Sequence, residues 1–396
     1  MGIRETIGEF DFIKSTLYEK DHMEKISGMK EYSYAYRAVG VCLRVNLPVI
    51  LWGAPGQGKT KVVEHFAKQT GRELRTILAS IREPQDFVGL PAIVNDKMEY
   101  RAPSWALSLA ELAEQGNAGI VFFDEVSTAP PSVQAALLRV CLEKVVGDCE
   151  LGLETRVIAA ANPPDIAADG WDLAPPLANR FCHIDWALPA EVVAKGFSDS
   201  WPSFDLPAVT DADLEQTVSF EKLAVAAFLK RDPAIVTVMP ESTNDQGRAF
   251  PTPRSWEMAA RVSAAATLMG LEEDLRFLLI EGCVGHVAAR NYCTFRAAQD
   301  LPDPEEVIAN PMMELPKRPD QLYYTGYNVL NALRLNNSSN RWDQVGEFIY
   351  RLCEMDLPDV ALSIHHQWTK LAPQGGFENR KISIKLSKFR KYLETK

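Results

Sequence analysis

From residue 48 to residue 61 the chain reads Pro48-Val49-Ile50-Leu51-Trp52-Gly53-Ala54-Pro55-Gly56-Gln57-Gly58-Lys59-Thr60-Lys61. An apolar run typical of a β-strand is followed by a glycine-rich turn that ends in Gly-Lys-Thr, the complete pattern G-x-x-x-x-G-K-T of a phosphate-binding loop. Backbone N–H groups of such a loop converge on a polyphosphate, and the N-terminus of the following helix attracts the same anion. The sequence therefore predicts a nucleotide-binding site over residues 53–61.

Two side chains of this loop have predicted roles. Lys59 is expected to reach the β- and γ-phosphates, and the hydroxyl of Thr60 to bind the Mg²⁺ that accompanies the nucleotide. Residues 61–70 have apolar positions at helical spacing, and Gly71 is suited to end that helix. A glycine-rich turn that only resembles the motif is the alternative, and the agreement of both flanks disfavours it.

Composition limits the class of protein. At 396 residues the chain should form about two or three domains. The net charge of −11 disfavours broad, non-specific nucleic-acid binding but leaves a local basic channel open. Seven cysteines without a C-x-x-C pair and six histidines without ligand spacing indicate neither a disulfide framework nor a zinc site. We expect a cytoplasmic protein, because the sequence shows no signal peptide and no apolar run of ~18 residues.

A second apolar run, residues 119–123, ends in two carboxylates, Asp124 and Glu125. Parallel sheets place ligand chemistry at the carboxyl ends of their strands. Asp124 is expected to hold Mg²⁺ directly or through water, and Glu125 to orient and activate the attacking water. An isolated apolar run followed by Asp-Glu is a weak signal, but its position roughly 60 residues beyond the phosphate-binding loop favours the catalytic interpretation.

Three polar residues further along the chain complete the predicted site. Asn162 follows an apolar strand and can bind the γ-phosphate or the lytic water, although a simple Asx turn is the alternative. Arg180 comes before the last predicted strand, where its guanidinium can stabilise charge on a transferred phosphoryl group from the domain edge. Arg254, in the first turn of a long helix, can reach back to the γ-phosphate from a second domain. For both arginines the alternative is an ordinary surface residue.

Other segments have structural interpretations. Residues 30–46 are expected to form a helix beside the sheet, and residues 92–100 a hairpin that interrupts a helix and contacts either a substrate or only solvent. Helical patterns replace strands from residue 187 onward, and the proline-rich residues 301–318 are expected to be a connection. Residues 380–393 read as a basic amphipathic helix that either docks an acidic partner or is solvated.

Together these motifs resemble those of the AAA+ ATPases, and within them the MoxR type, related to the dynein-like subfamily. The resemblance rests on GAPGQGKT (53–60), IVFFDE (120–125), TRVIAAANPP (155–164), LANRF (177–181) and TPRSWEMA (252–259). It implies that residues 53–60 are Walker A, that Asp124 and Glu125 are Walker B, and that Asn162 is sensor 1. It also implies that Arg180 is the arginine finger and Arg254 is sensor 2.

The same resemblance implies more about assembly. The hairpin at 92–102 would be the helix-2 insert that faces a central pore. Family members form hexameric rings and act as chaperone-like remodelling motors, often beside a partner with a von Willebrand A domain. Two features depart from the pattern: Asn179 stands where relatives often carry an acid, and residues 311–396 extend beyond the usual lid.

We therefore expect an α/β fold, a P-loop NTPase core with a five-stranded mostly parallel sheet followed by an α-helical lid and a helical C-terminal extension. The expected domains are 1–29, an N-terminal extension; 30–190, the core; 191–310, the lid; and 311–396, the extension. The expected function is Mg-ATP hydrolysis at the interfaces of a ring that remodels a partner protein. The alternatives are a nucleic-acid-directed motor of the restriction-system type that uses GTP or ATP, and a nucleotide-gated scaffold with little turnover.

Overall fold

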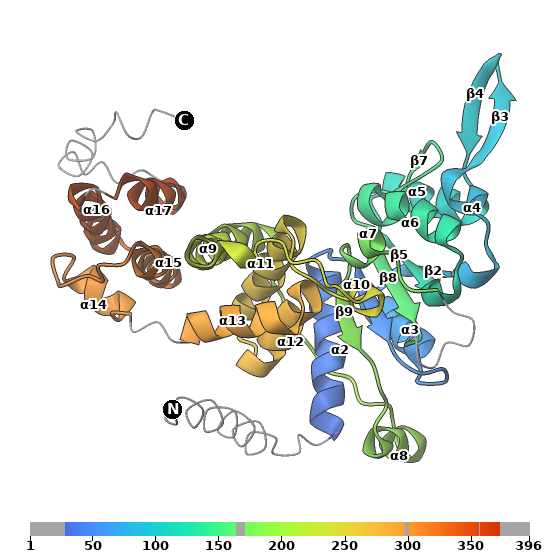
Figure 1. Ribbon diagram of the computed structural model, residues 1–396, viewed down its shortest axis with the longest axis horizontal. Coiled ribbons are helices and arrows are strands. Elements are labelled where there is room, and N and C mark those ends of the chain that lie inside the picture. Colours follow the sequence, from blue (N-terminus) through green and yellow to red (C-terminus); the bar gives the residue numbers. More distant parts are fainter. Residues whose placement is uncertain (1–27, 164–170, 298–300, 356, 373–396) are drawn as a thin grey trace, which may run out of the picture.

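The computed structural model describes residues 28–163, 171–297, 301–355 and 357–372. At its centre is a five-stranded sheet in the order β2-β5-β8-β1-β9 (Figure 1). The strands are β1 (Val49–Trp52), β2 (Glu73–Leu78), β5 (Gly119–Asp124), β8 (Arg156–Ala161) and β9 (Cys182–Asp185). Every pairing in this sheet is parallel, which confirms the predicted α/β core with a five-stranded sheet.

Helices cover both faces of the sheet, as a parallel sheet requires. Ile50 and Trp52 of β1 face one apolar cluster, whereas Val49 and Leu51 face the other. The Val49 face is covered by α2 (Gly28–Arg44) and α3 (Lys59–Thr70). The Ile50 face is covered by α4 (Gln85–Val88), α5 (Ser104–Glu114), α6 (Pro131–Glu143) and α7 (Pro175–Ala178). The predicted helix beside the sheet at residues 30–46 is confirmed as α2.

The predicted hairpin is present between α4 and α5. It consists of β3 (Leu90–Val94) and β4 (Lys97–Arg101), paired antiparallel. Asn95 and Asp96 form its turn with φ angles of 52° and 61°, which these two residue types tolerate better than most. Figure 1 shows the hairpin extending away from the sheet.

A second, smaller hairpin was not predicted. It is formed by β6 (Val145–Val146) and β7 (Cys149–Glu150), between α6 and β8. Strands of two residues are too short to show a period in the sequence. This hairpin holds the base of the first, because the backbone N–H of Asp148 donates to the Tyr100 carbonyl at 3.0 Å and the Tyr100 N–H donates to the Asp148 carboxylate at 2.7 Å.

Helices make up the chain beyond β9. They are α8 (Ala190–Ser198), α9 (Asp211–Arg231), α10 (Thr243–Gln246), α11 (Pro253–Leu268), α12 (Glu273–Val284), α13 (His286–Ala297), α14 (Pro304–Ala309), α15 (Pro319–Leu335), α16 (Ser339–Glu354) and α17 (Pro358–Lys370). Thr210 caps α9 by accepting from the Asp213 N–H. The expected connection at 301–318 differs in containing α14, whose N-cap is Asp303.

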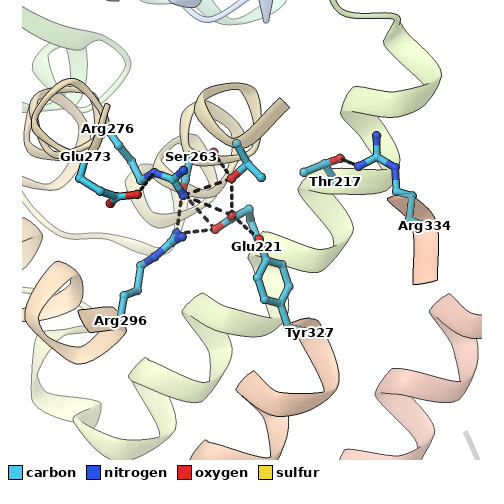
Figure 2. Close-up of polar contacts among 9 residues, drawn as sticks. Thr217, Glu221, Ser263, Glu273, Arg276, Arg296, Tyr327 and Arg334 are labelled. Carbon is cyan, nitrogen blue, oxygen red and sulfur yellow. Dashed lines mark hydrogen bonds and ion pairs between the residues drawn. The ribbon is translucent and has the colours of Figure 1, made fainter. Parts of the chain in front are cut away.

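A buried polar network fastens α15 to the helices before it (Figure 2). At its centre is Glu221 of α9, whose side chain is fully buried. Its carboxylate accepts from Arg296 of α13 at 2.9 Å, from the Tyr327 hydroxyl of α15 at 2.6 Å, and from Ser263 of α11 at 3.0 Å. A buried carboxylate is tolerated only with such partners, so four helices are tied at this point.

Within the described part of the chain, no helix combines the length and apolar character needed to cross a bilayer. The predicted basic helix at 380–393 and the N-terminal segment before residue 28 lie outside the described residues.

Candidate nucleotide-binding site

The glycine-rich loop lies between β1 and α3, at the carboxyl edge of the sheet. Gly58 caps α3 with a φ of 71°, a conformation that glycine adopts without strain. Gly53 passes so close to the chain after β9 that a Cβ there would lie 2.3 Å from the Trp186 carbonyl oxygen. The Trp186 indole donates to the Gln57 carbonyl at 2.9 Å, and the Leu188 N–H donates to the Gln57 side chain at 2.8 Å. These contacts hold the loop open as a cradle for an anion.

Lys59 points back across the loop. Its ammonium donates to two loop carbonyls, at 2.5 and 3.1 Å, and to Oδ1 of Asn162 at 2.9 Å. Burial lowers the pKa of Lys59, whereas the nearby charges of Asp124 and Glu125 raise it. The lysine therefore connects the loop to the end of β8. The phosphate contacts expected of Lys59 and Asn162 stay predictions.

Thr60 and Asp124 meet at the predicted metal position. The Thr60 hydroxyl donates to Oδ2 of Asp124 at 2.9 Å. Hydroxyl and carboxylate oxygens are the ligands that Mg²⁺ prefers, so this donor set fits the ion. The described residues contain no group of three or more His, Cys, Asp or Glu side chains able to hold a metal alone. A magnesium ion at this point would therefore need phosphate or water oxygens as its remaining ligands.

Glu125 adopts the left-handed conformation, with φ of 57° and ψ of 42°, directly after β5. Such a backbone is strained for a residue with a side chain and is common at functional sites. Its Oε2 accepts a 2.7 Å hydrogen bond from the Ser80 hydroxyl. Sequence reasoning missed Ser80, although the register that pairs Leu78 with Asp124 explains why a residue just beyond β2 lies beside Glu125.

Asn162 follows β8 and is hydrogen-bonded to Ser127, which lies just after the neighbouring strand β5. Its backbone N–H donates to the Ser127 hydroxyl at 3.1 Å. Five predicted residues thus gather at the carboxyl edge of the sheet: Lys59, Thr60, Asp124, Glu125 and Asn162.

Arg180 lies at the amino-terminal edge of the sheet, opposite the edge where the other five predicted residues lie. It precedes β9, in which Cys182 pairs with Val49 and Asp185 pairs with Trp52, so the phosphate-binding loop begins at the far end of the neighbouring strand. The strand alone separates the two ends by about 13 Å. Burial lowers the pKa of Arg180, and the charge of Arg254 lowers it further.

Arg254 lies in the first turn of α11. The Thr252 hydroxyl, at the start of α11, donates to the Asn179 side chain at 2.8 Å, and the Asn179 amide donates to the Phe250 carbonyl at 3.1 Å. These bonds anchor α11 beside Arg180 at the amino-terminal edge of β9. The prediction that Arg254 reaches back to the γ-phosphate stays a prediction.

Asn179 has a role that an acid could not reproduce. Its amide group donates to one partner and accepts from another, whereas an ionised carboxylate would only accept and would face the Phe250 carbonyl. The presence of Asn179, where relatives often carry an acid, therefore fits the hydrogen bonds that this side chain makes.

Residues 48–181 match the sequence profile of the AAA domain of the dynein-related subfamily. Over this segment the chain is similar to the AAA domains of that subfamily. The matched segment includes the loop, Asp124, Glu125, Asn162 and Arg180, but ends before Arg254. The segment that is similar to an AAA domain therefore contains most of the predicted site residues.

Several known proteins are similar to parts of the chain. The DNA-binding transcriptional regulator NtrC of Proteus hauseri is 28% identical over 133 residues, which is 32% of this chain and 28% of that protein. The chain thus spans little more than a quarter of this curated relative. A candidate ATPase from Cytophaga hutchinsonii superimposes with a TM-score of 0.42 at 18% identity, over 70% of this chain and 90% of that one. A full-length MCM homologue from Methanopyrus kandleri superimposes with a TM-score of 0.36 at 16% identity, over 66% of this chain and 57% of that one.

Proposed function

We propose that this chain is a MoxR-type AAA+ motor that hydrolyses Mg-ATP at the interfaces of a ring and remodels a partner protein. One observation carries the proposal: the residues suited to nucleotide chemistry lie at two opposite edges of one sheet. Lys59 and Glu125 are at the carboxyl edge, whereas Arg180 is at the amino-terminal edge of β9. An arginine there can serve the nucleotide of a neighbouring chain, so the complete site requires two subunits.

In the proposed reaction each residue at the carboxyl edge of the sheet has one role. Mg²⁺, when bound with the nucleotide at Thr60 and Asp124, neutralises phosphate charge. Glu125 leaves Ser80 to orient the attacking water and accept its proton. Lys59 and Asn162 hold the γ-phosphate.

Arginine completes this site from the next subunit. Arg180 stabilises the negative charge of the transferred phosphoryl group there. Arg254, which is exposed and close to Arg180, acts from the same side.

The β3–β4 hairpin is the proposed contact for the client. Antiparallel register puts Pro91, Ile93, Met98 and Tyr100 on one face of the hairpin, and all four are exposed. Ile93 is 79% exposed and Met98 is 65% exposed. Exposed apolar side chains in such a group mark surfaces that bind other proteins. An apolar client segment is therefore favoured over nucleic acid, which basic surfaces bind.

The remaining divisions of the chain follow from this proposal. We assign residues 30–190 to the core with its hairpin, 191–310 to the lid, and 311–396 to an extension that the Glu221 network attaches to the lid. The proposed setting is the cytoplasm, with a hexamer as the proposed ring. A von Willebrand A protein is the proposed class of partner.

The test measures ATP turnover per subunit against protein concentration, for the wild type, Arg180→Ala and Glu125→Gln. We expect wild-type turnover to rise with concentration and both variants to lose it by about 100-fold. Mixing the two variants should restore activity, because about a quarter of randomly mixed interfaces join an intact Glu125 to an intact Arg180.

Each other outcome points to a named alternative. No recovery on mixing would contradict a shared site. Tight Mg-ATP binding with flat, negligible turnover would favour the nucleotide-gated scaffold. Turnover that rises only with added DNA, in a salt-dependent manner, would favour the nucleic-acid-directed motor.

A further inference from the structure

A cavity of about 400 Å³ lies at the amino-terminal edge of the sheet, on the face covered by α2 and α3. Its wall includes Arg44 at the end of α2, Arg72 just after α3, and Arg156 at the start of β8. Because β8 begins at residue 156 and ends beside Asn162, this cavity lies at the opposite edge from the phosphate-binding loop. It is therefore separate from the candidate nucleotide site.

The arginines around this cavity bind mostly uncharged partners. Arg156 Nε donates to the Leu43 carbonyl at 2.6 Å, and Arg72 Nη1 donates to the Glu154 carbonyl at 3.1 Å. Arg44 donates to the Val209 carbonyl. Backbone carbonyls satisfy N–H groups but do not neutralise positive charge.

Carboxylates balance the cations only in part. Lys144, behind Arg156, brings the number of cations to four. In the part of the chain that the structure describes, Glu154 alone has a carboxylate within 4.0 Å of any of them, and its side chain is 68% exposed. Asp205 also lines the cavity, but it accepts from Gln69 at 3.3 Å. Three arginines thus line the cavity beside one carboxylate, Asp205. Lys144, Glu154 and Asp211 lie near Arg156 outside the lining, so positive charge is in excess around the cavity.

The positive charges of these side chains repel one another, which destabilises their charged forms. The pKa of Lys144 is lowered to about 8, mainly by burial and also by repulsion from Arg156 and Arg72. Burial, followed by the charge of Arg72, lowers the pKa of Arg156 as well. An anion within the cavity would relieve this repulsion.

We propose that this cavity is a second anion site, which binds a small phosphate-bearing molecule. Guanidinium groups match phosphate oxygens in geometry and in charge, so Arg72 and Arg156 would hold the phosphate. Phe66 and Leu206 supply an apolar wall for the rest of the molecule. Residues 204–208 line the far side and lead into α9, so the ligand would brace this connection against the sheet.

The test uses the full chain carrying Lys59→Ala, which disables the phosphate-binding loop. Titration calorimetry with inorganic pyrophosphate should show one site per subunit. Adding Arg72→Gln should weaken its affinity by at least about tenfold, the loss expected for one charge-assisted contact. Arg139→Gln, which removes a surface arginine paired with Glu143 on α6, is the matched control and should change nothing.

Three results would overturn the proposal: no pyrophosphate binding in Lys59→Ala, equal affinity with and without Arg72→Gln, or an equal loss in the Arg139→Gln control. Arg44→Gln gives the same comparison if Arg72→Gln fails to fold, because Arg44 is exposed and its loss should still weaken binding several-fold. None of these results depends on ATP turnover, so the second site and the proposed motor function can fail separately.

Discussion

The Ser80 hydroxyl donates a 2.7 Å hydrogen bond to Oε2 of Glu125, the carboxylate proposed to activate water. The two residues come from the ends of adjacent parallel strands, so their contact depends on the β2–β5 register. This bond occupies one acceptor position of the carboxylate and fixes its orientation, so a water molecule must compete with it or bind at a free position. Ser80 therefore restrains the proposed catalytic base.

Ser80→Ala should raise basal ATP turnover several-fold, up to about tenfold, because the loss of a hydrogen bond to a charged group lowers the cost of releasing Glu125. Steady-state turnover at saturating Mg-ATP measures the effect. Ser219→Ala is the control, because Ser219 is a surface serine of α9 that bonds only its own helix. A fall in turnover would instead mean that Ser80 positions Glu125 productively.

Ile93→Ser with Met98→Ser should leave ATP turnover unchanged and abolish capture of unfolded protein, because these exposed residues form the apolar face of the hairpin. ATP-dependent binding of a permanently unfolded protein, reduced and carboxymethylated α-lactalbumin, measures capture. Lys97→Ser with Glu99→Ser, on the opposite face, is the matched control. Undiminished capture by the apolar-face variant would exclude this face as the client contact.

His183 should make the protein sensitive to acid. The Trp52 indole donates to Nδ1 at 2.9 Å, and Nε2 lies 2.9 Å from the Ala178 carbonyl, which suits the neutral ring. The pKa of His183 is lowered from 6.5 to about 4, mainly by burial and also by the charge of Arg248, while the bond to the Ala178 carbonyl and the charge of Asp185 oppose the shift. Between pH 6.5 and 4 only the unfolded chain binds this proton.

The free energy of unfolding should therefore be fully retained above pH 6.5 and fall as the pH drops, by about 2 kcal/mol at pH 5 from this residue. Urea unfolding at pH 7 and pH 5 measures the difference. His183→Gln should reduce the difference, whereas His65→Gln, which alters an exposed histidine, should not. An identical pH dependence in His183→Gln would contradict the assignment.

Glu221→Gln should lower the free energy of unfolding by about 3 kcal/mol, because it leaves the largely buried Arg296 without its counter-charge. Chemical denaturation measures the loss. Adding Arg296→Met should restore part of the stability, since it removes the unpaired charge. Glu215→Gln, at an exposed ion pair with Arg261, should cost less than about 0.5 kcal/mol. Similar losses at positions 221 and 215 would show that the network contributes little.

Short patterns of neighbouring residues in the sequence predicted much of the fold and of the candidate site. The loop at 53–60 is recognisable because its glycines, lysine and threonine are adjacent in the chain, and the strand and helix beside it have their own periods. The acids after β5 and the amide after β8 were predicted to converge, because parallel strands end at one edge. The I′-type turn at Asn95 and Asp96 was equally local.

By itself, the sequence determined the α/β core, the order of its strands along the chain, and the residue types available for phosphate and metal chemistry. Only the tertiary structure decided that Ser80 holds Glu125, that Arg254 lies near Arg180, and that three arginines line one cavity. These relationships join residues far apart in the chain, and they depend on strand register and helix packing. A motif of adjacent residues carries its own geometry, whereas the meeting of distant side chains is determined by how the whole chain packs.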